Sequence, residues 1–300
     1  MKTLLYIYNP MSGKGQAGAK LQELLTYYTQ NGYLVTIYPT FKENDTAYMV
    51  RDYLDKYDLV ICAGGDGTLH EAINGYEQTS KARAIGYIPM GTTNDFAKNL
   101  NIPQNYNQAM KTILNGRARQ MDIGKFNEES FIYVAAFGVF TDIPYRTPQK
   151  QKNLLGHAAY MLQSAKSIGD IKGVHAIVEY DGNRIEGEYA VGLITNSASI
   201  AGFKSPVSDD VNLADGLFEM ILIEKPANLI EAGNLVGEML SGNLKSDKIF
   251  YAQASEMTIC SDPVEWTLDG EFGGMHDKVK ISVVPNAIKM IVEEESEENE

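Results

Sequence analysis

A glycine-rich segment near residue 65 has the residue types and spacing that suit phosphate chemistry. Gly64-Gly65-Asp66-Gly67-Thr68 follows the apolar run 58–63 and precedes a helical pattern. Glycines let backbone amides approach an anion closely, and a helix N-terminus adds N–H groups and the positive end of a dipole. Asp66 is suited to a phosphate-bound Mg²⁺. The alternative interpretation is a tight turn in which Asp66 only caps the next helix.

Two further glycine segments follow the same logic. Residues 13–18 match G-x-G-x-x-G between a strand and a helix pattern, but residues 38–40 lack the carboxylate that a dinucleotide site places after its second strand. This argues against a nicotinamide-dependent dehydrogenase, and a plain strand–helix turn stays open. In segment 91–95, hydroxyls can donate to phosphate, while Asn94 or Asp95 can instead cap a helix. The chain has no G-x-x-x-x-G-K-[ST] motif, which argues against a P-loop NTPase.

The elements around these segments alternate. Short strands, apolar throughout, are expected at 4–8, 35–38, 58–63 and 84–88, and they alternate with helical patterns up to about residue 122. The helices are expected at about 17–30, at 44–56 with an Asn or Asp cap, at about 69–76 and near 95–100. The alternation predicts an α/β domain with a parallel sheet covered on both faces. Residues 123–286 favour strands joined by hairpin turns, which predicts a mostly antiparallel β-sandwich or barrel. Residues 287–295 are expected to return to the first domain, and 296–300 to form a disordered acidic tail.

Three motifs in register resemble the diacylglycerol kinase catalytic domain, and more narrowly the soluble bacterial lipid kinases of that family. They are Asn9-Pro10-x-Ser12-Gly13, Gly64-Gly65-Asp66-Gly67-Thr68-x-x-Glu71-x-x-Asn74-Gly75 and Pro89-x-Gly91-Thr92-x-Asn94-Asp95-Phe96-Ala97. His70 and Thr93 depart from the family pattern, which usually has Asn and often Ala there. The resemblance covers nearly the whole chain and implies a two-domain plan shared with NAD kinases. It also implies ATP and Mg²⁺ as cofactors.

The resemblance implies a set of nucleotide contacts, which carry over residue by residue. They are Asn9, Ser12, Gly13, Thr40, Gly64, Gly65, Asp66, Gly67, Thr68, Leu69, His70, Thr92 and Asn94.

The resemblance also implies the catalytic and metal groups. Glu271, in the D-G-E segment 269–271, would be the general base, with Asp66 as a second catalytic carboxylate. By residue type alone, D-G-E is a hairpin turn with a solvated glutamate. A structural Mg²⁺ would be held by the Asp215 carboxylate and the backbone carbonyls of Asn212 and Leu217, where the alternative is a β-turn. Asp122 would join Asp66 and Asp95 in a water-linked network towards the metal.

Some residues keep two interpretations. Lys14, Lys20 and Lys98 lie in or beside the loops and could attract ATP phosphates or anionic headgroups, or be ordinary surface lysines. The apolar stripe of a helix expected at 151–168 suits the core, and otherwise a lipid surface. Trp266 suits the core better than a substrate platform.

Charge and cysteine content set outer limits. The net charge of −13 argues against a general nucleic-acid binder. Residues 1–122 carry a net +1, however, and the tail from Glu293 to Glu300 carries −6, so the loops are not in an acidic region. The two cysteines each lie in an apolar run, and no run approaches a membrane span of roughly 18 residues. We therefore expect a cytoplasmic protein that touches a membrane peripherally.

The function expected from the sequence is an ATP- and Mg²⁺-dependent lipid kinase, with diacylglycerol as the default acceptor and phosphatidic acid as the product. Two alternatives stay open: an NAD kinase-like nucleotide kinase, and a non-catalytic lipid- or nucleotide-binding module. A homodimer is also possible.

Overall fold

The computed structural model describes residues 1–91, 94–138, 171–196, 199–200, 203–204, 213–241 and 246–293. The chain forms two compact units. Unit 1 comprises Met1–Met121 and the chain from Asn286 onward, and unit 2 comprises Asp122–Pro285. The helix expected at 151–168, Thr92 and Asn212 lie outside the described residues, as does the tail beyond residue 293.

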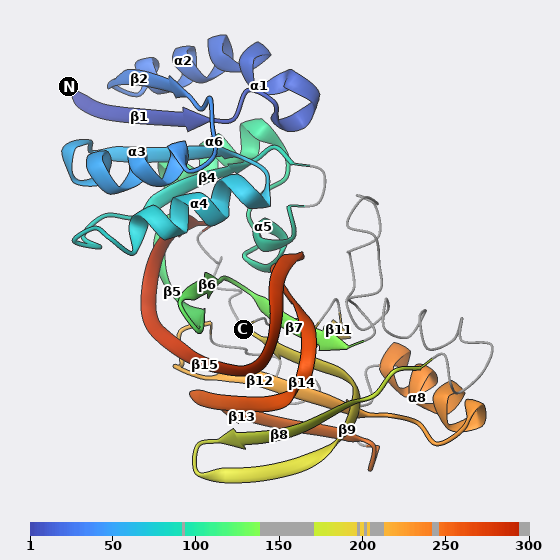
Figure 1. Ribbon diagram of the computed structural model, residues 1–300. Coiled ribbons are helices and arrows are strands. Elements are labelled where there is room, and N and C mark those ends of the chain that lie inside the picture. Colours follow the sequence, from blue (N-terminus) through green and yellow to red (C-terminus); the bar gives the residue numbers. More distant parts are fainter. Residues whose placement is uncertain are drawn as a thin grey trace, which may run out of the picture. The chain divides into compact units, whose positions relative to one another are not determined.

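Unit 1 is built on a sheet in which β1 (Lys2–Tyr8) pairs in parallel with β2 (Tyr33–Pro39) and with β3 (Leu59–Gly64). β3 pairs in parallel with β4 (Ile85–Pro89), which in turn pairs with the end of β15 (Glu271–Val292) through Met290 and Ile85. All four N-terminal strands run in the same direction, so their carboxyl ends share one edge of the sheet. Figure 1 shows β1 and β2 side by side.

Helices follow these strands in the order expected for such a sheet. Their bounds are α1 Gln16–Ala19, α2 Leu21–Gln30, α3 Asp45–Tyr53, α4 Asp66–Tyr76, α5 Asp95–Asn99 and α6 Tyr106–Asn115, with short 3-10 turns at Ser12–Gly15 and Leu54–Lys56. Leu24 of α2 and Ile113 of α6 pack with Leu4 and Tyr6 of β1 in one apolar cluster. The other face of β1, with Leu5 and Ile7, is fully buried as well. Burial on both faces explains why these strands are apolar throughout.

Unit 2 consists mainly of antiparallel strands. Their bounds are β5 Arg117–Phe126, β6 Glu129–Phe131, β7 Val134–Gly138, β8 Val174–Tyr180, β9 Asn183–Thr195, β10 Ser199–Ile200, β11 Phe203–Lys204, β12 Phe218–Glu224, β13 Ile249–Ala254 and β14 Glu256–Leu268, followed by β15. The first residues of β5, up to Met121, belong to unit 1. β9 and β14 each pair with β7 at one end and with β8 at the other. The pairing therefore closes into a circuit from β9 through β7, β14 and β8 back to β9.

The core of unit 2 is aromatic. Trp266 is 1% exposed and lies 5.0 Å from the Phe126 ring and 4.8 Å from the Phe137 ring, measured between centroids. The structure thus confirms Trp266 as a core residue. A second apolar cluster joins α8 (Leu229–Ser241) to β9 and β12, where Leu235 packs with Val191 and Ile221.

Three local expectations differ from the structure. The helix expected from about Ala17 to Gln30 is divided at Lys20 into α1 and α2, and Gly18 weakens the first piece because glycine is a poor helix former. α4 begins at Asp66, three residues earlier than expected, so Asp66, Gly67 and Thr68 form its first turn. α6 was not expected, although Asn105 caps it by accepting hydrogen bonds from the N–H groups of residues 107 and 108.

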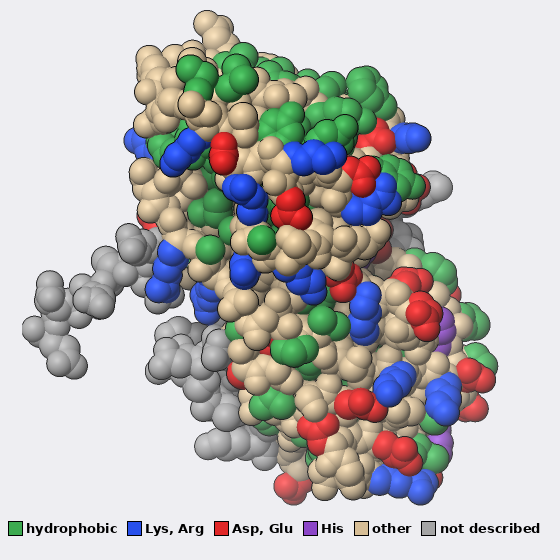
Figure 2. Space-filling model, turned by 90° about the vertical axis from the view of Figure 1, so that its left-hand side faces the viewer, with side chains coloured by type: hydrophobic (Ala, Val, Ile, Leu, Met, Phe, Trp, Pro, Cys, Tyr) green, Lys and Arg blue, Asp and Glu red, His purple; other side chains and the backbone are tan. Residues whose placement is uncertain are grey.

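Within the described ranges, no helix combines the length and the apolar character needed to cross a membrane. On the face drawn in Figure 2, lysine and arginine side chains are interspersed with aspartate and glutamate side chains.

Candidate functional site

The chain reverses direction immediately after β1. The Asn9 N–H donates to the Ala63 carbonyl at the end of β3 (3.0 Å), and the Asn9 side-chain oxygen accepts from the Met11 N–H (2.9 Å). The Ser12 N–H donates back to the Asn9 carbonyl (3.1 Å), and Gly13 follows with a φ of 61°. Glycine is favoured at Gly13 because a side chain disfavours this left-handed conformation. The predicted contacts Asn9, Ser12 and Gly13 therefore lie together in one tight turn at the edge of the sheet.

The segment after β3 forms the N-terminus of α4. Gly65 is the N-cap residue in an extended conformation, and since glycine has no side chain, the first amides of α4 receive no side-chain cap. A Cβ at Gly64 would collide with the Thr68 side chain, whereas a Cβ at Gly67 would meet no atom within 4 Å. Gly64 thus allows close packing of the buried Thr68. The amides at this helix start can receive an anion.

The segment after β4 approaches the α4 N-terminus closely. A Cβ built at Gly91 would lie 2.7 Å from the Cα of Gly65, so only glycine allows this approach. The buried Asn94 accepts a hydrogen bond from the Gly91 N–H (2.8 Å) and donates to the Gly91 carbonyl (2.9 Å) and to Gln104 (3.0 Å). Asn94 is the N-cap residue of α5 but its side chain makes no capping bond. It shapes the Gly91 loop instead.

Tyr87 of β4 is fully buried and contacts the chain just before α4. Its hydroxyl donates to the Gly64 carbonyl (2.9 Å). Burial raises the pKa of Tyr87 well above its ordinary value, and the negative charge of Asp66 raises it further. The Asp66 charge therefore acts on Tyr87 of β4. Leu69 is fully buried, and His70 is half-buried one residue further along α4.

The turn after β2 places Thr40 at the same edge. The Thr40 N–H donates to the Tyr8 carbonyl at the end of β1 (2.9 Å). The buried Asp45 carboxylate accepts from the N–H groups of Phe41 (2.8 Å) and Lys42 (3.1 Å), which holds the turn that follows.

Glu71 is a residue whose role the sequence did not indicate. From α4, its two carboxylate oxygens accept hydrogen bonds from the N–H groups of Asn44 (2.9 Å) and Thr46 (3.1 Å) at the start of α3. The expectation that an Asn or Asp side chain caps this helix is wrong for Asn44, whose side chain makes no cap bond. With φ at 66°, Asn44 instead offers its backbone N–H to Glu71.

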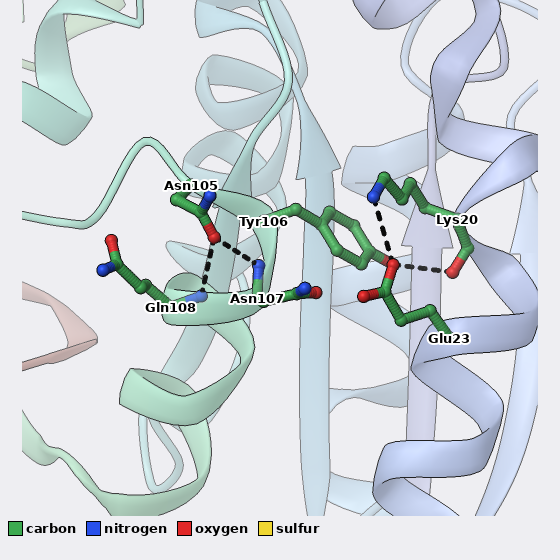
Figure 3. Close-up of polar contacts among 6 residues, drawn as sticks. All are labelled: Lys20, Glu23, Asn105, Tyr106, Asn107 and Gln108. Atoms are coloured by element: carbon green, nitrogen blue, oxygen red, sulfur yellow. Dashed lines mark hydrogen bonds and ion pairs between the residues drawn. The ribbon is translucent and has the colours of Figure 1, made fainter.

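The three lysines differ in what the structure describes. Lys20 forms an ion pair with Glu23 (3.1 Å), and its carbonyl accepts a hydrogen bond from the Tyr106 hydroxyl (3.3 Å), as drawn in Figure 3. The Lys20 ammonium nitrogen lies 5.6 Å from the centroid of the Tyr106 ring. Hydrogen bonds from Lys20 and then from Asn107 lower the pKa of Glu23. Lys98 is exposed in the last turn of α5. The side chains of Lys14 and Asp95 lie outside the described set.

In unit 2, the predicted metal residues Asp215 and Leu217 lie in one turn. The Asp215 carboxylate accepts from the Leu217 N–H (3.0 Å), and Gly216 between them has a φ of 78°. The fully buried Asp122 holds this turn: its carboxylate accepts from the Gly216 N–H (2.7 Å) and its N–H donates to the Leu213 carbonyl (2.8 Å).

Some of the oxygen atoms in this turn are suited to binding a hard cation. A carboxylate and nearby main-chain carbonyls are the oxygen ligands that Mg²⁺ prefers. The described residues contain no group of three or more His, Cys, Asp or Glu side chains that could hold a metal ion. Any metal here would therefore depend on backbone carbonyls and water beside Asp215.

Glu271 is the first residue of β15, where it pairs with Leu268 across a two-residue turn. Its side chain is exposed. It belongs to unit 2, as does Asp122, whereas Asp66 and Asp95 belong to unit 1. The water-linked network of the three aspartates stays a prediction.

Within unit 1, the predicted nucleotide contacts that the structure describes lie at one edge of the sheet. The turns after β1 and β2 and the glycine loops after β3 and β4 all lie at the carboxyl ends of neighbouring parallel strands, which is where ligands bind in open α/β sheets. The amides at the start of α4 receive no side-chain cap, and Gly65 and Gly91 approach each other closely. Together with the turn at Asn9–Gly13, these segments form a candidate phosphate cradle. The residues present fit a nucleotide.

Two family models match the chain. Residues 3–126 match the diacylglycerol kinase catalytic domain, and residues 137–292 match the YegS C-terminal NAD kinase beta sandwich-like domain. The chain therefore has two domains: a diacylglycerol kinase catalytic domain followed by a β-sandwich-like domain.

Similar proteins cover most of the chain. A diacylglycerol kinase from Staphylococcus epidermidis is 38% identical over 271 residues, which are 89% of this chain and 85% of that protein. One from Bacillus subtilis is 36% identical over 279 residues, or 92% and 91%. A crystal structure of a diacylglycerol kinase from Bacillus anthracis shares the fold, with a TM-score of 0.77, 23% identity and 97% coverage of both chains. The chain belongs to the diacylglycerol kinase family of lipid kinases.

Proposed function

We propose that this protein transfers the γ-phosphate of ATP to the hydroxyl of diacylglycerol, yielding phosphatidic acid and ADP, and that it requires Mg²⁺. The observation that carries the proposal is the phosphate cradle at the carboxyl edge of the unit 1 sheet, formed by residues of all three family motifs. The names of the similar proteins support the choice of lipid.

In the proposed reaction, Glu271 accepts the proton of the lipid hydroxyl as that oxygen attacks the γ-phosphorus and the bond to the ADP oxygen breaks. The amides at the start of α4 and in the turn after β1 bind and orient the phosphates. Bound Mg²⁺ would neutralise phosphate charge. Asp66, in the first turn of α4, would help to hold it near the nucleotide, and Asp215 with Asn212 and Leu217 would hold a second, structural ion.

The test is to identify the phosphate acceptor directly. The purified protein is incubated with γ-labelled ATP, Mg²⁺ and a lipid extract, with NAD in a parallel reaction, and the products are identified by mass spectrometry. We expect labelled phosphatidic acid and no labelled NADP. Label in NADP alone would favour the NAD kinase alternative, and no label in any product would favour a non-catalytic binding module.

We further propose that the protein meets its lipid at the membrane surface, because diacylglycerol resides in bilayers. Vesicles of phosphatidylcholine with and without diacylglycerol can be floated with the protein. More protein should float with the vesicles that contain diacylglycerol, and equal amounts would contradict the proposal.

A further inference from the structure

The turn that precedes Glu271 has an unusual backbone conformation. Asp269 and Gly270 both have positive φ angles, 50° and 88°, between the paired residues Leu268 and Glu271. Two such central residues form the type I′ turn, whose twist matches that of the flanking strands. The conformation of Asp269 therefore sets the direction in which the chain enters Glu271.

The side chain of Asp269 is fixed to a distant part of the chain. Its carboxylate accepts three backbone hydrogen bonds, from the N–H groups of Ile132 (2.7 Å), Tyr133 (2.9 Å) and Val134 (3.0 Å). Three donors on one carboxylate hold it in a single orientation, because each oxygen already has a directed partner.

The backbone of Asp269 is held by the same segment. Its N–H donates to the Val134 carbonyl (2.8 Å), and its carbonyl accepts the Tyr133 hydroxyl (3.1 Å). β7 also pairs with β14 up to Leu268, so these bonds extend the attachment past the end of the strand into the turn. A two-residue turn at the end of a hairpin can tilt about the strand pair, and this attachment prevents it.

We propose that Asp269 is a positioning residue for Glu271. This inference rests on the proposed function, in which Glu271 is the general base. Asp269 fixes the turn to residues 132–134, and so places the exposed Glu271 carboxylate, two residues along, within reach of the lipid hydroxyl. Misplacement of a reacting group by about 1 Å can cost on the order of 10²-fold in rate.

A second turn in unit 2 offers a matched control. Asp181 and Gly182 also have positive φ angles, 41° and 83°, between paired residues of β8 and β9. The Asp181 carboxylate accepts from the Ser255 N–H (3.0 Å), the Ser255 hydroxyl (3.1 Å) and the Glu256 N–H (3.1 Å). The two aspartates hold their turns in the same way, but no predicted catalytic residue follows Asp181.

The experiment compares kcat and KM for phosphorylation of diacylglycerol in mixed micelles, at a temperature where every variant is folded by circular dichroism. Asp269→Ala should lower kcat about 100-fold and change the KM for ATP less than about twofold. Asp269→Asn should recover most of the rate, because asparagine tolerates the positive φ and keeps one oxygen acceptor. Asp181→Ala should keep the wild-type kcat.

The double variant Asp269→Ala/Glu271→Gln tests whether Asp269 acts through Glu271. If Asp269 acts through Glu271, adding Asp269→Ala to Glu271→Gln should lower kcat by less than about threefold, since a missing base cannot be misplaced. A further 100-fold loss in the double variant, or wild-type kcat in Asp269→Ala, would overturn the inference. If Asp269→Ala does not fold, Asp269→Gly takes its place, because glycine tolerates the positive φ and also lacks the carboxylate. Wild-type kcat in Asp269→Gly, or a further 100-fold loss when it is added to Glu271→Gln, would overturn the inference. If Glu271→Gln alone keeps the wild-type rate, the proposed role of Glu271 has failed, and the inference falls with it.

Discussion

At the scale of single residues, the site depends on backbone amides kept accessible by glycine and on a few carboxylates with distinct tasks. Gly65 and Gly91 allow two loops to meet. The Asn94 side chain holds the Gly91 loop by donating to the Gly91 carbonyl, and it also donates to Gln104. Asp66 differs from these because it contributes charge at a helix start. We therefore expect its removal to affect chemistry more than stability.

Asp66→Asn should lower kcat by about 100-fold or more, because the variant loses the charge proposed to hold Mg²⁺ near the nucleotide. Its cost in stability should be about 0.5 kcal/mol, the usual value for one charge at a helix N-terminus. Activity assays and thermal unfolding measure both effects. Asp52→Asn is the control, because Asp52 is on the surface beside Arg51. Equal activity in the two variants would contradict the role of Asp66.

At the scale of elements, α4 links the phosphate cradle to the neighbouring turn. Its first residue is Asp66, and its Glu71 caps α3 from outside that helix. The turn that carries Thr40 lies a few residues before this cap, so the loops after β2 and β3 are structurally coupled.

Glu71→Ala should destabilise the protein by about 1 to 2 kcal/mol, because two backbone amides lose their acceptor. It should also raise the KM for ATP, because the turn after Thr40 loosens. Urea unfolding and steady-state kinetics give the two values. Glu43→Ala is the control: it removes a carboxylate from an exposed position in the turn between Thr40 and α3. The free energy of unfolding and the KM for ATP of this variant should stay within error of the wild type. Equal effects of the two substitutions would contradict the coupling.

The Asp181 turn predicts a pH dependence of stability. The hydrogen bond from the Ser255 N–H, followed by that from the Glu256 N–H, holds the pKa of Asp181 below its ordinary value. A pKa lowered by folding means that the charged form stabilises the fold above the unfolded pKa of about 4, and that this stabilisation is lost as pH falls through the folded pKa. The difference in free energy of unfolding between wild type and Asp181→Asn should be larger at pH 7 than at pH 3. A difference independent of pH in urea titrations would contradict this.

The sequence predicts elements and loops well where the signal is local. The glycine loops follow strands as expected, and the apolar runs match β1, β3 and β4 within a few residues. α6 was missed although Asn105 and the apolar residues Ala109, Met110 and Ile113 were a readable signal. The role of Asp269 had no such signal, because its partners lie 135 to 137 residues away. Contacts between residues so far apart in the sequence depend on the fold, and no local sequence pattern predicts them.

At the scale of the whole molecule, β15 contributes residues to both units, as β5 also does. β15 begins with Glu271 in unit 2, and its last residues pair with β4 in unit 1. Ile288, Met290 and Val292 are buried there. Glu271 and the residues that extend the sheet of unit 1 therefore lie on the same strand, β15.

Truncation tests the contribution of this strand end. A chain ending at Pro285 loses three large buried side chains, worth about 5 to 9 kcal/mol. This equals much of the stability of an ordinary domain, so unit 1 should unfold and ATP binding should be lost. A chain ending at Glu293 keeps the strand and should match the full-length protein in thermal unfolding. Normal ATP binding by the shorter chain would contradict this assignment.

The central claim is that the phosphate cradle and Glu271 together phosphorylate a lipid hydroxyl. It is tested most directly by the initial rate of label transfer from γ-labelled ATP to dioleoylglycerol in mixed micelles, for the wild type and for Glu271→Gln. We predict labelled phosphatidic acid from the wild type and a rate lower by about 100-fold or more in the variant. No labelled lipid from the wild type, or equal rates in both proteins, would contradict the account.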